Sequence, residues 1–167
     1  VYSVSDDGGR IAYVTEVDGV PRIAVYDRAT AETTIIGAVR DPAWQWALNP
    51  DISGDGRFVV YASNNADLSG RPSRSSLDVY VHDMTTGETR LVTVNEVSGT
   101  APTPGSYFSS ISADGRTITV ETTEAYGDDG DETVDLYVFD NPLNNPDAPR
   151  VVNDRYTVGE DADVVLD

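Results

Sequence analysis

The sequence predicts an all-β fold made of three repeated units, each a sheet of four short antiparallel strands. A Ser-x-Asp-Gly turn recurs in the chain, beginning at Ser5, Ser53 and Ser112; arginine follows it directly in the second and third units and after one more glycine in the first. Two apolar stretches follow each turn, and the second stretch ends in an aspartate, namely Asp27, Asp83 or Asp140. No segment has the apolar period of about 3.6 residues that indicates an amphipathic helix. Such self-similarity along a chain is typical of a repeat architecture.

Each unit begins with a short strand that leads into the Ser-x-Asp-Gly turn. Glycine tolerates a positive φ, and aspartate can accept hydrogen bonds from the backbone of the turn, so this sequence is typical of a tight turn. The aspartates of the three turns are Asp7, Asp55 and Asp114. A residue that recurs in every unit is expected to stabilise the structure of that unit. We therefore predict that these aspartates, like those at the strand ends, cap turns and do not catalyse a reaction.

The remaining strands follow in a fixed order. The second strand is expected at residues 11–15, 58–62 and 117–121, which are rich in β-branched and aromatic side chains. The third strand is the apolar stretch that ends in aspartate, at residues 23–27, 79–83 and 136–140. A Thr-Gly-Glu turn, or Thr-Ala-Glu in the first unit, then leads to the fourth strand. We expect that strand at residues 33–36, 89–93 and, after a proline-rich insertion, 150–152.

Four antiparallel strands repeated at about 45 residues are typical of one blade of a β-propeller. The starts of the units, together with the run DVYVHDMTTGET at residues 78–89, resemble the TolB-type, WD-like β-propeller repeats of exported bacterial proteins. The resemblance covers residues 1–152 and implies three blades, at about 1–40, 41–97 and 98–152. It implies a fold and not a particular activity, because propellers host many unrelated functions.

Three blades are fewer than the ~4–8 blades of closed propellers. The chain is therefore expected to be a partial propeller or to be completed by other chains. Further blades upstream of Val1 are the favoured explanation. The alternatives are two copies that complete one ring and copies that stack into a filament. Open strand edges would favour such association.

The tail, residues 153–167, has a different pattern. Its run NDRYTVGED at residues 153–161 resembles the opening strand of a bacterial cadherin-like, Ig-type repeat. The resemblance implies that such a domain begins here. An acidic linker is the alternative, and a lone strand could also add to the open sheet edge of a neighbour.

The charge of the chain limits its partners. It has 29 acidic and 11 basic residues and a formal net charge of −18. Phosphate backbones and anionic membranes bind basic surfaces, so nucleic acid and membrane surfaces are not expected partners. The absence of cysteine excludes disulfides and thiolate metal sites. No apolar run approaches the ~18 residues of a membrane-spanning helix, so membrane insertion is not expected.

The acidic loop of the third unit is the strongest candidate for a metal site. Asp129, Asp131 and Asp135 follow the pattern Asp-x-Asp-x-x-x-Asp in a loop that contains glycine. Ca²⁺ prefers several carboxylate and carbonyl oxygens, and alternating acids in such a loop can direct them to one centre. In the resembling repeats this hairpin often looks like a calcium loop. Ca²⁺ is therefore the candidate cofactor of this loop, and a solvated acidic turn is the favoured alternative.

Trp44 and Trp46 form the candidate ligand-binding pair. They lie two residues apart, so both indoles fall on one face of a strand. Flat apolar rings of this kind can stack against sugar rings. The alternative is that both side chains fill the space between two blades.

His82 is the only histidine, and the sequence gives it no catalytic role. The repeats place Tyr26 and Phe139 at the position of His82, which indicates a packing site for a ring. With one histidine and no cysteine, a zinc site is not expected. We find no nucleophile paired with a base, so catalytic residues are not assigned.

These features predict a non-enzymatic structural or binding module of a secreted or cell-surface bacterial protein, in contact with protein or glycan partners. The resemblance implies an extracellular, cell-surface or periplasmic location. One alternative is a self-assembling surface-layer or filament subunit, joined through open blade edges or the C-terminal strand. Another is the accessory propeller of a larger hydrolase whose catalytic groups lie elsewhere.

Overall fold

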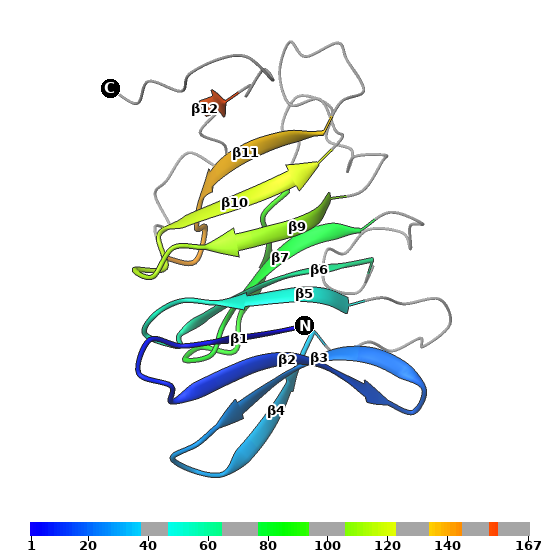
Figure 1. Cartoon of the computed structure of the whole chain (residues 1–167), viewed down its shortest axis with the longest axis vertical. Helices are drawn as coiled ribbons and strands as arrows, with labels where there is room; N and C mark the ends of the chain where they lie inside the picture. Colours follow the sequence, from blue (N-terminus) through cyan, green and yellow to red (C-terminus); the bar gives the residue numbers. More distant parts are fainter. Residues whose placement is uncertain (38–46, 65–76, 94–105, 123–133, 145–153, 157–167) are drawn as a thin grey trace.

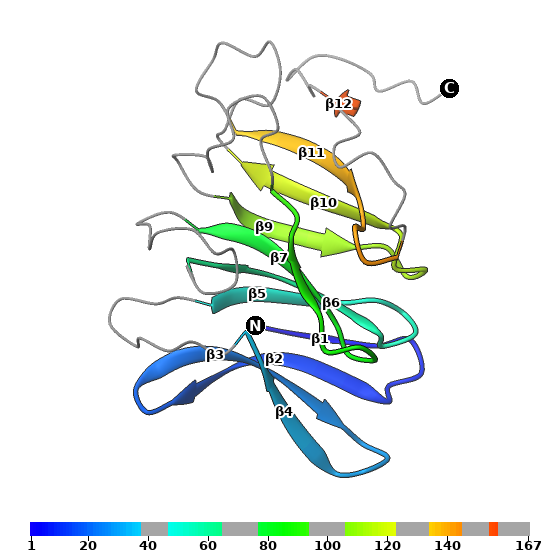
Figure 2. The ribbon, with the colours of Figure 1, turned by 180° about the vertical axis from the view of Figure 1, so that it is seen from behind.

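The computed structural model contains three antiparallel sheets of four strands each, stacked face to face (Figures 1 and 2). It describes residues 1–37, 47–64, 77–93, 106–122, 134–144 and 154–156. These residues form no helix, so they offer none that is long and apolar enough to cross a bilayer. The predicted all-β fold of three four-stranded blades is confirmed.

The strands of each blade are hydrogen-bonded in sequence order. Blade one contains β1 (Tyr2–Val4), β2 (Arg10–Val17), β3 (Val20–Asp27) and β4 (Glu32–Ile36). Blade two contains β5 (Ala47–Ile52), β6 (Phe58–Ser63), β7 (Asp78–Asp83) and β8 (Thr89–Leu91). Blade three contains β9 (Ser106–Ile111), β10 (Thr117–Thr122), β11 (Asp135–Asp140) and β12 (Asp154–Tyr156).

The described fourth strand of blade three lies just beyond the expected residues 150–152. It is β12, in which Tyr156 lies opposite Leu136 of β11. The expected strand at residues 150–152 lies outside the described residues. Residues 154–156, at the start of the expected tail, therefore form a strand of blade three. Residues 157–167 are not described, and the cadherin-like identity of the tail stays a prediction.

The core lies in the two seams between the blades. The seam between blades one and two is filled by apolar side chains that include Ile23, Val25, Val59, Tyr61 and Tyr80. The seam between blades two and three is filled by a second set that includes Phe58, Val60, Val79, Ile118 and Phe139. Every residue of β6 and β7 is buried, because blade two has a neighbour on each face.

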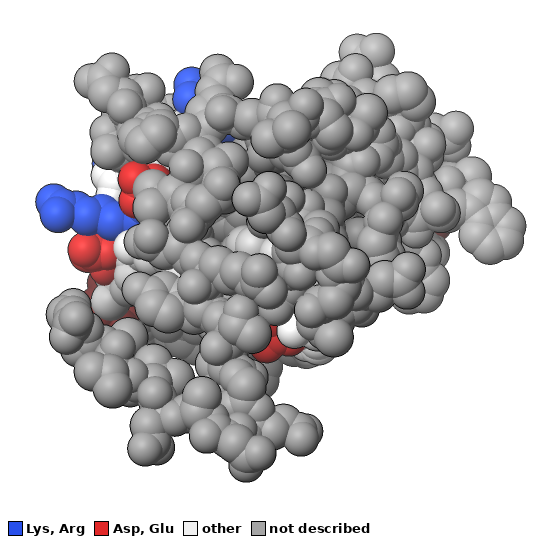
Figure 3. Space-filling view, turned by 90° about the horizontal axis from the view of Figure 1, so that it is seen from above, with Lys and Arg blue, Asp and Glu red and all other residues white. Residues whose placement is uncertain are grey.

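Two features of this stack position the candidate site. The first strands of neighbouring blades contact each other, β1 with β5 and β5 with β9. The three Ser-x-Asp-Gly turns all lie along the same side of the stack, on the left of Figure 1. Described acidic and basic side chains adjoin one another at this edge when the molecule is seen from above (Figure 3).

Candidate functional site

The Ser-x-Asp-Gly turns are built alike in the three blades. In each turn the serine hydroxyl donates a hydrogen bond to the aspartate, over 2.7 Å in blade one and 2.6 Å in blades two and three. The same carboxylate accepts a backbone N–H two residues later, at Gly9, Arg57 or Arg116. The serine hydrogen bond, supported by the backbone one, lowers the pKa of Asp7 and Asp114. The predicted capping role of these aspartates is confirmed.

A ladder of backbone hydrogen bonds joins the turns of successive blades. The N–H of Asp6 donates to the carbonyl oxygen of Gly54, and the N–H of Gly54 donates to that of Ala113, each over 2.9 Å. All three residues hold the second position of their turns. The ladder therefore has a direction, because each blade donates to the blade that follows it.

In blade two, an ion pair joins Arg57, just before β6, to Asp83, the last residue of β7. Arg57 donates to both carboxylate oxygens of Asp83, over 3.2 and 2.8 Å, in the bidentate geometry that makes such pairs strong. The side chain of Asp83 is only 2% exposed. Burial alone would raise the pKa of Asp83, but the hydrogen bonds from Arg57 and the N–H of Thr85 outweigh it and lower the pKa to about 2.

Asp83→Asn should therefore destabilise the protein by about 2 kcal/mol near neutral pH. The ion pair contributes fully above the unfolded-state pKa of 3.8 and is lost as the pH falls through the folded-state pKa of about 2. The stability difference between wild type and Asp83→Asn should accordingly shrink from pH 5 to pH 2, measured by urea unfolding. In blade three, Arg116 lies 3.9 Å from Asp114, and the described residues show no ion pair at Asp140, so Asp140→Asn is the matched control. A difference that stays constant with pH would contradict this account.

The arginine of blade one is not equivalent to the other two. The cross-strand pairs Arg10–Asp27, Phe58–Asp83 and Thr117–Asp140 hold the same place in the three blades. Gly9 therefore stands where Arg57 and Arg116 stand in the later blades, and Arg10 stands where Phe58 does. Its guanidinium reaches Asp27 over 3.1 Å and the carbonyl oxygen of Gly56 over 3.0 Å. Blade one carries one more glycine between its Asp-Gly turn and its arginine, and this shift of one residue turns Arg10 toward blade two.

Asp51 connects all three blades. Its side chain accepts hydrogen bonds over 2.6 Å from the hydroxyls of Ser3 in blade one and Ser110 in blade three. It also accepts the N–H groups of Ile52 and Ile111, over 3.0 and 2.9 Å. This carboxylate was missed in the sequence, although it stands two residues before Ser53, where the other blades carry serine.

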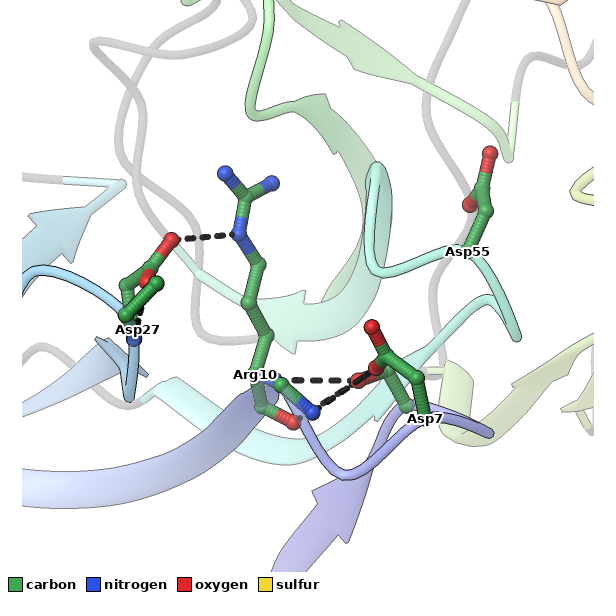
Figure 4. Close-up of a pocket in the computed structure, with 7 residues that line it drawn as sticks. Asp7, Arg10, Asp27 and Asp55 are labelled. Carbon is green, nitrogen blue, oxygen red and sulfur yellow. Dashed lines mark hydrogen bonds and ion pairs between the residues drawn. The ribbon is translucent and has the colours of Figure 1, made fainter.

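A hollow of about 300 Å³ opens between the turns of blades one and two. It is lined by Ser5, Asp7, Gly9, Arg10, Asp27, Ala29 and Asp55. Figure 4 shows the side chain of Arg10 between Asp27 on one side and Asp7 and Asp55 on the other. These groups are engaged in the turn and ion-pair contacts above. The described residues also contain no group of three or more acidic or histidine side chains arranged to hold a metal ion.

His82 is held in the seam between blades one and two. Its Nδ1 lies 2.8 Å from the Thr89 hydroxyl, and the side chain is largely buried. Burial lowers the pKa of His82, although the neighbouring Asp83 carboxylate acts in the opposite direction. This environment agrees with the packing role inferred from the repeats.

The sequence-predicted ligand residues lie mostly beyond the described parts of the chain. Trp44, Trp46, Asp129 and Asp131 are outside the described residues. Asp135 is the first residue of β11, opposite Thr122, and its side chain is also outside the description. The calcium site and the tryptophan platform stay predictions.

Calcium should raise the melting temperature if the predicted loop binds it. A ligand that binds only the folded state stabilises by about 2.7 kcal/mol at a hundredfold excess over its Kd. The melting temperature is measured in Ca²⁺ and in chelator, for wild type and for Asp129→Asn. An unchanged melting temperature of the wild type would remove Asp129, Asp131 and Asp135 as ligands.

Comparison with known proteins shows the fold. No family model matches the sequence, and no curated protein matches it. Among solved structures, TolB from Acinetobacter baumannii matches 84% of this chain with a TM-score of 0.52 and 18% identity. The β-propeller domain of the Trilobed protease from Pyrococcus furiosus matches 96% with a TM-score of 0.62 and 13% identity. Pyrococcus horikoshii acylaminoacyl peptidase matches 93% with a TM-score of 0.53 and 14% identity.

These likenesses are partial in length. The chain covers 29% of the TolB chain, 43% of the Trilobed protease chain and 24% of the peptidase chain. Sequence identities this low show a shared fold and do not show a shared activity. The three sheets of this chain are therefore β-propeller blades, and together they form part of a propeller.

Proposed function

We propose that the chain is a non-enzymatic structural and binding module of an exported or cell-surface bacterial protein. The supporting observation is that the acid and base groups of its described turns are engaged in structural bonds. Asp7, Asp55 and Asp114 cap turns, Asp83 is paired with Arg57, and Asp51 joins the blades. Groups held in this way stabilise the blades and their turns, and loops on such a rigid framework can present a binding surface.

The partner of this module is a protein or a glycan, and Trp44 with Trp46 is the proposed glycan platform. Retention on columns of immobilised bacterial polysaccharide tests it. The wild type should be retarded, and Trp44→Ala or Trp46→Ala should remove the retardation without changing the melting temperature. Phe108→Ala, at a 57% exposed aromatic side chain on β9, is the matched control and should be retained like the wild type. Equal elution of all variants would overturn the glycan role.

The exported location rests on the resemblance to TolB-type repeats, and the likeness to TolB in fold supports it. An accessory propeller of a larger hydrolase is the second candidate. It is favoured by the likeness to the propeller domain of the Trilobed protease, the highest TM-score of the three comparisons above. Under either reading the chain alone should not cleave peptide substrates. Turnover that His82→Asn abolishes would contradict both.

A further inference from the structure

The dipeptide Asp-Gly recurs along the chain, with its aspartate at Asp7, Asp18, Asp55, Asp114 and Asp129. Asp129 lies outside the described residues. This dipeptide is prone to a rearrangement of the backbone, because glycine has no side chain to shield its nitrogen from the neighbouring carboxyl group. The other four sites can therefore be compared within one molecule.

In the three Ser-x-Asp-Gly turns, both groups that would react are held in hydrogen bonds. Each aspartate accepts the serine hydroxyl and a backbone N–H, as described above. The N–H of the glycine that follows, at Gly8, Gly56 or Gly115, donates to the serine carbonyl oxygen over 2.8 Å. The serine hydrogen bond, above all, lowers the pKa of Asp7 and Asp114. Their carboxyl groups are therefore less often in the neutral form that can lose water.

The fourth site, Asp18 with Gly19, forms the tip of the hairpin between β2 and β3, on the right of Figure 1 and across the stack from the other turns. Both residues are exposed, and no described residue forms a hydrogen bond with the Asp18 carboxylate or the Gly19 N–H. Nothing lies within 4 Å of the position that a Cβ of Gly19 would take. The aspartates of the other turns are exposed as well, so the difference lies in the hydrogen bonds.

The backbone of this tip is close to the shape that the rearrangement requires. Asp18 and Gly19 have φ of 53° and 78°, the positive values found at both central positions of a type I′ turn. Ring closure requires rotation of the peptide plane between them, which leads toward a type II′ turn. That turn also has a positive φ at its first central residue and also joins two strands through two residues. The closing pair of the hairpin, Val17 with Val20, can therefore stay formed while the ring closes.

We propose that Asp18 is a site of spontaneous isoaspartate formation in the folded protein. The nitrogen of Gly19 attacks Cγ of the neutral Asp18 carboxyl group, and the carboxyl hydroxyl leaves as water with the proton of that nitrogen. The product is a five-membered succinimide ring. Water then breaks one of the two ring C–N bonds. Breaking the bond to the original backbone carbonyl leaves the chain running through Cβ and Cγ of Asp18, and breaking the other bond restores aspartate. One water leaves and one returns, so the isomer keeps its mass and no oxidant or cofactor is needed.

The isomer adds one carbon to the backbone of a two-residue turn. Loop length sets the register of a hairpin, so this addition should loosen the closing pair Val17–Val20. The modification goes beyond the proposed binding role and does not depend on it.

Ageing the full chain at mildly acidic pH, in buffer and in urea, tests the proposal. An isoaspartyl methyltransferase labels the isomer with a methyl group from S-adenosylmethionine, and cleavage after arginine places the four aspartates in separate peptides. In buffer, the isomer should form at Asp18 at least about tenfold faster than in the three turns, where hydrogen bonds must break first. In urea the four rates should converge. Equal rates at the four sites in buffer, or label at Asp18 in urea alone, would overturn the proposal.

Two substitutions locate the effect. Asp18→Glu should remove the label from the peptide that carries residue 18, because glutamate would have to close a six-membered ring. Ser112→Ala removes the hydroxyl that Asp114 accepts and should speed isomerisation at Asp114 while leaving the rate at Asp18 unchanged. Melting temperatures show whether both variants fold. Wild-type labelling of that peptide in Asp18→Glu, or an unchanged rate at Asp114 in Ser112→Ala, would contradict the account.

Discussion

Replacing Gly115 with alanine is expected to lower the free energy of unfolding by about 3 kcal/mol. Gly115 has φ of 69°, and a Cβ there would lie 2.6 Å from Cδ2 of Phe58. Phe58 is 1% exposed and lies beneath the Arg57 guanidinium, 4.6 Å from the ring centre, so it has little room to move. The added methyl group therefore presses apart the turns of blades two and three.

Gly87→Ala is the matched control for this prediction. Gly87 has φ of 75°, but nothing lies within 4 Å of the position of its Cβ. It carries the backbone cost of a positive φ without the contact between blades, and we expect a loss of about 1 kcal/mol. Urea unfolding of both variants measures the difference. Equal losses would show that Gly115 is required only for its backbone conformation and that the turns do not pack as described.

Asp51→Ala is expected to lower the free energy of unfolding by about 3 kcal/mol, because the Asp51 carboxylate accepts hydrogen bonds across both seams. Its removal leaves the hydroxyls of Ser3 and Ser110 and the N–H of Ile111 without their acceptor. Each partly buried donor that loses its acceptor costs about 1 kcal/mol or more. Thermal unfolding of this variant should therefore show a clear fall in melting temperature.

Asp51→Asn tests how much of this loss comes from the negative charge and how much from the hydrogen bonds. The amide keeps one acceptor oxygen, so this variant should lie between the wild type and Asp51→Ala. A double-mutant cycle with Ser3→Ala and Ser110→Ala measures the link to each neighbouring blade. Additive losses in both cycles would contradict the role of Asp51 as a connection between blades one and three.

Much of the fold could be predicted from the sequence, because it depends on local patterns. The Ser-x-Asp-Gly turns, the β-branched strands after them and the aspartates at the strand ends each recur three times. The capping role of Asp7 followed from the same repetition. His82 could be assigned to packing because Tyr26 and Phe139 share its position.

The contacts between blades could not be predicted in the same way. A shift of one residue moves a side chain to the other face of a strand, so the extra glycine before Arg10 redirects that side chain. In the sequence, Asp51 is one acidic residue among many. Its role becomes clear only when the fold places Ser3 and Ser110 on either side of it. Strand β12 at Asp154–Tyr156 carries no apolar alternation or turn motif that could have marked it in the sequence.

The three blades should unfold together as one cooperative unit on which loops can present a binding surface. Amide hydrogen exchange of the chain measures this cooperativity. The N–H groups of Asp6, Gly54 and Ile111 cross the two seams, so they should exchange with one common free energy, equal to that of global unfolding. The N–H of Ala113, which no described acceptor binds, should exchange fast. Fast exchange at Asp6 with protection at Gly54 and Ile111 would show that blade one opens by itself and would contradict the account.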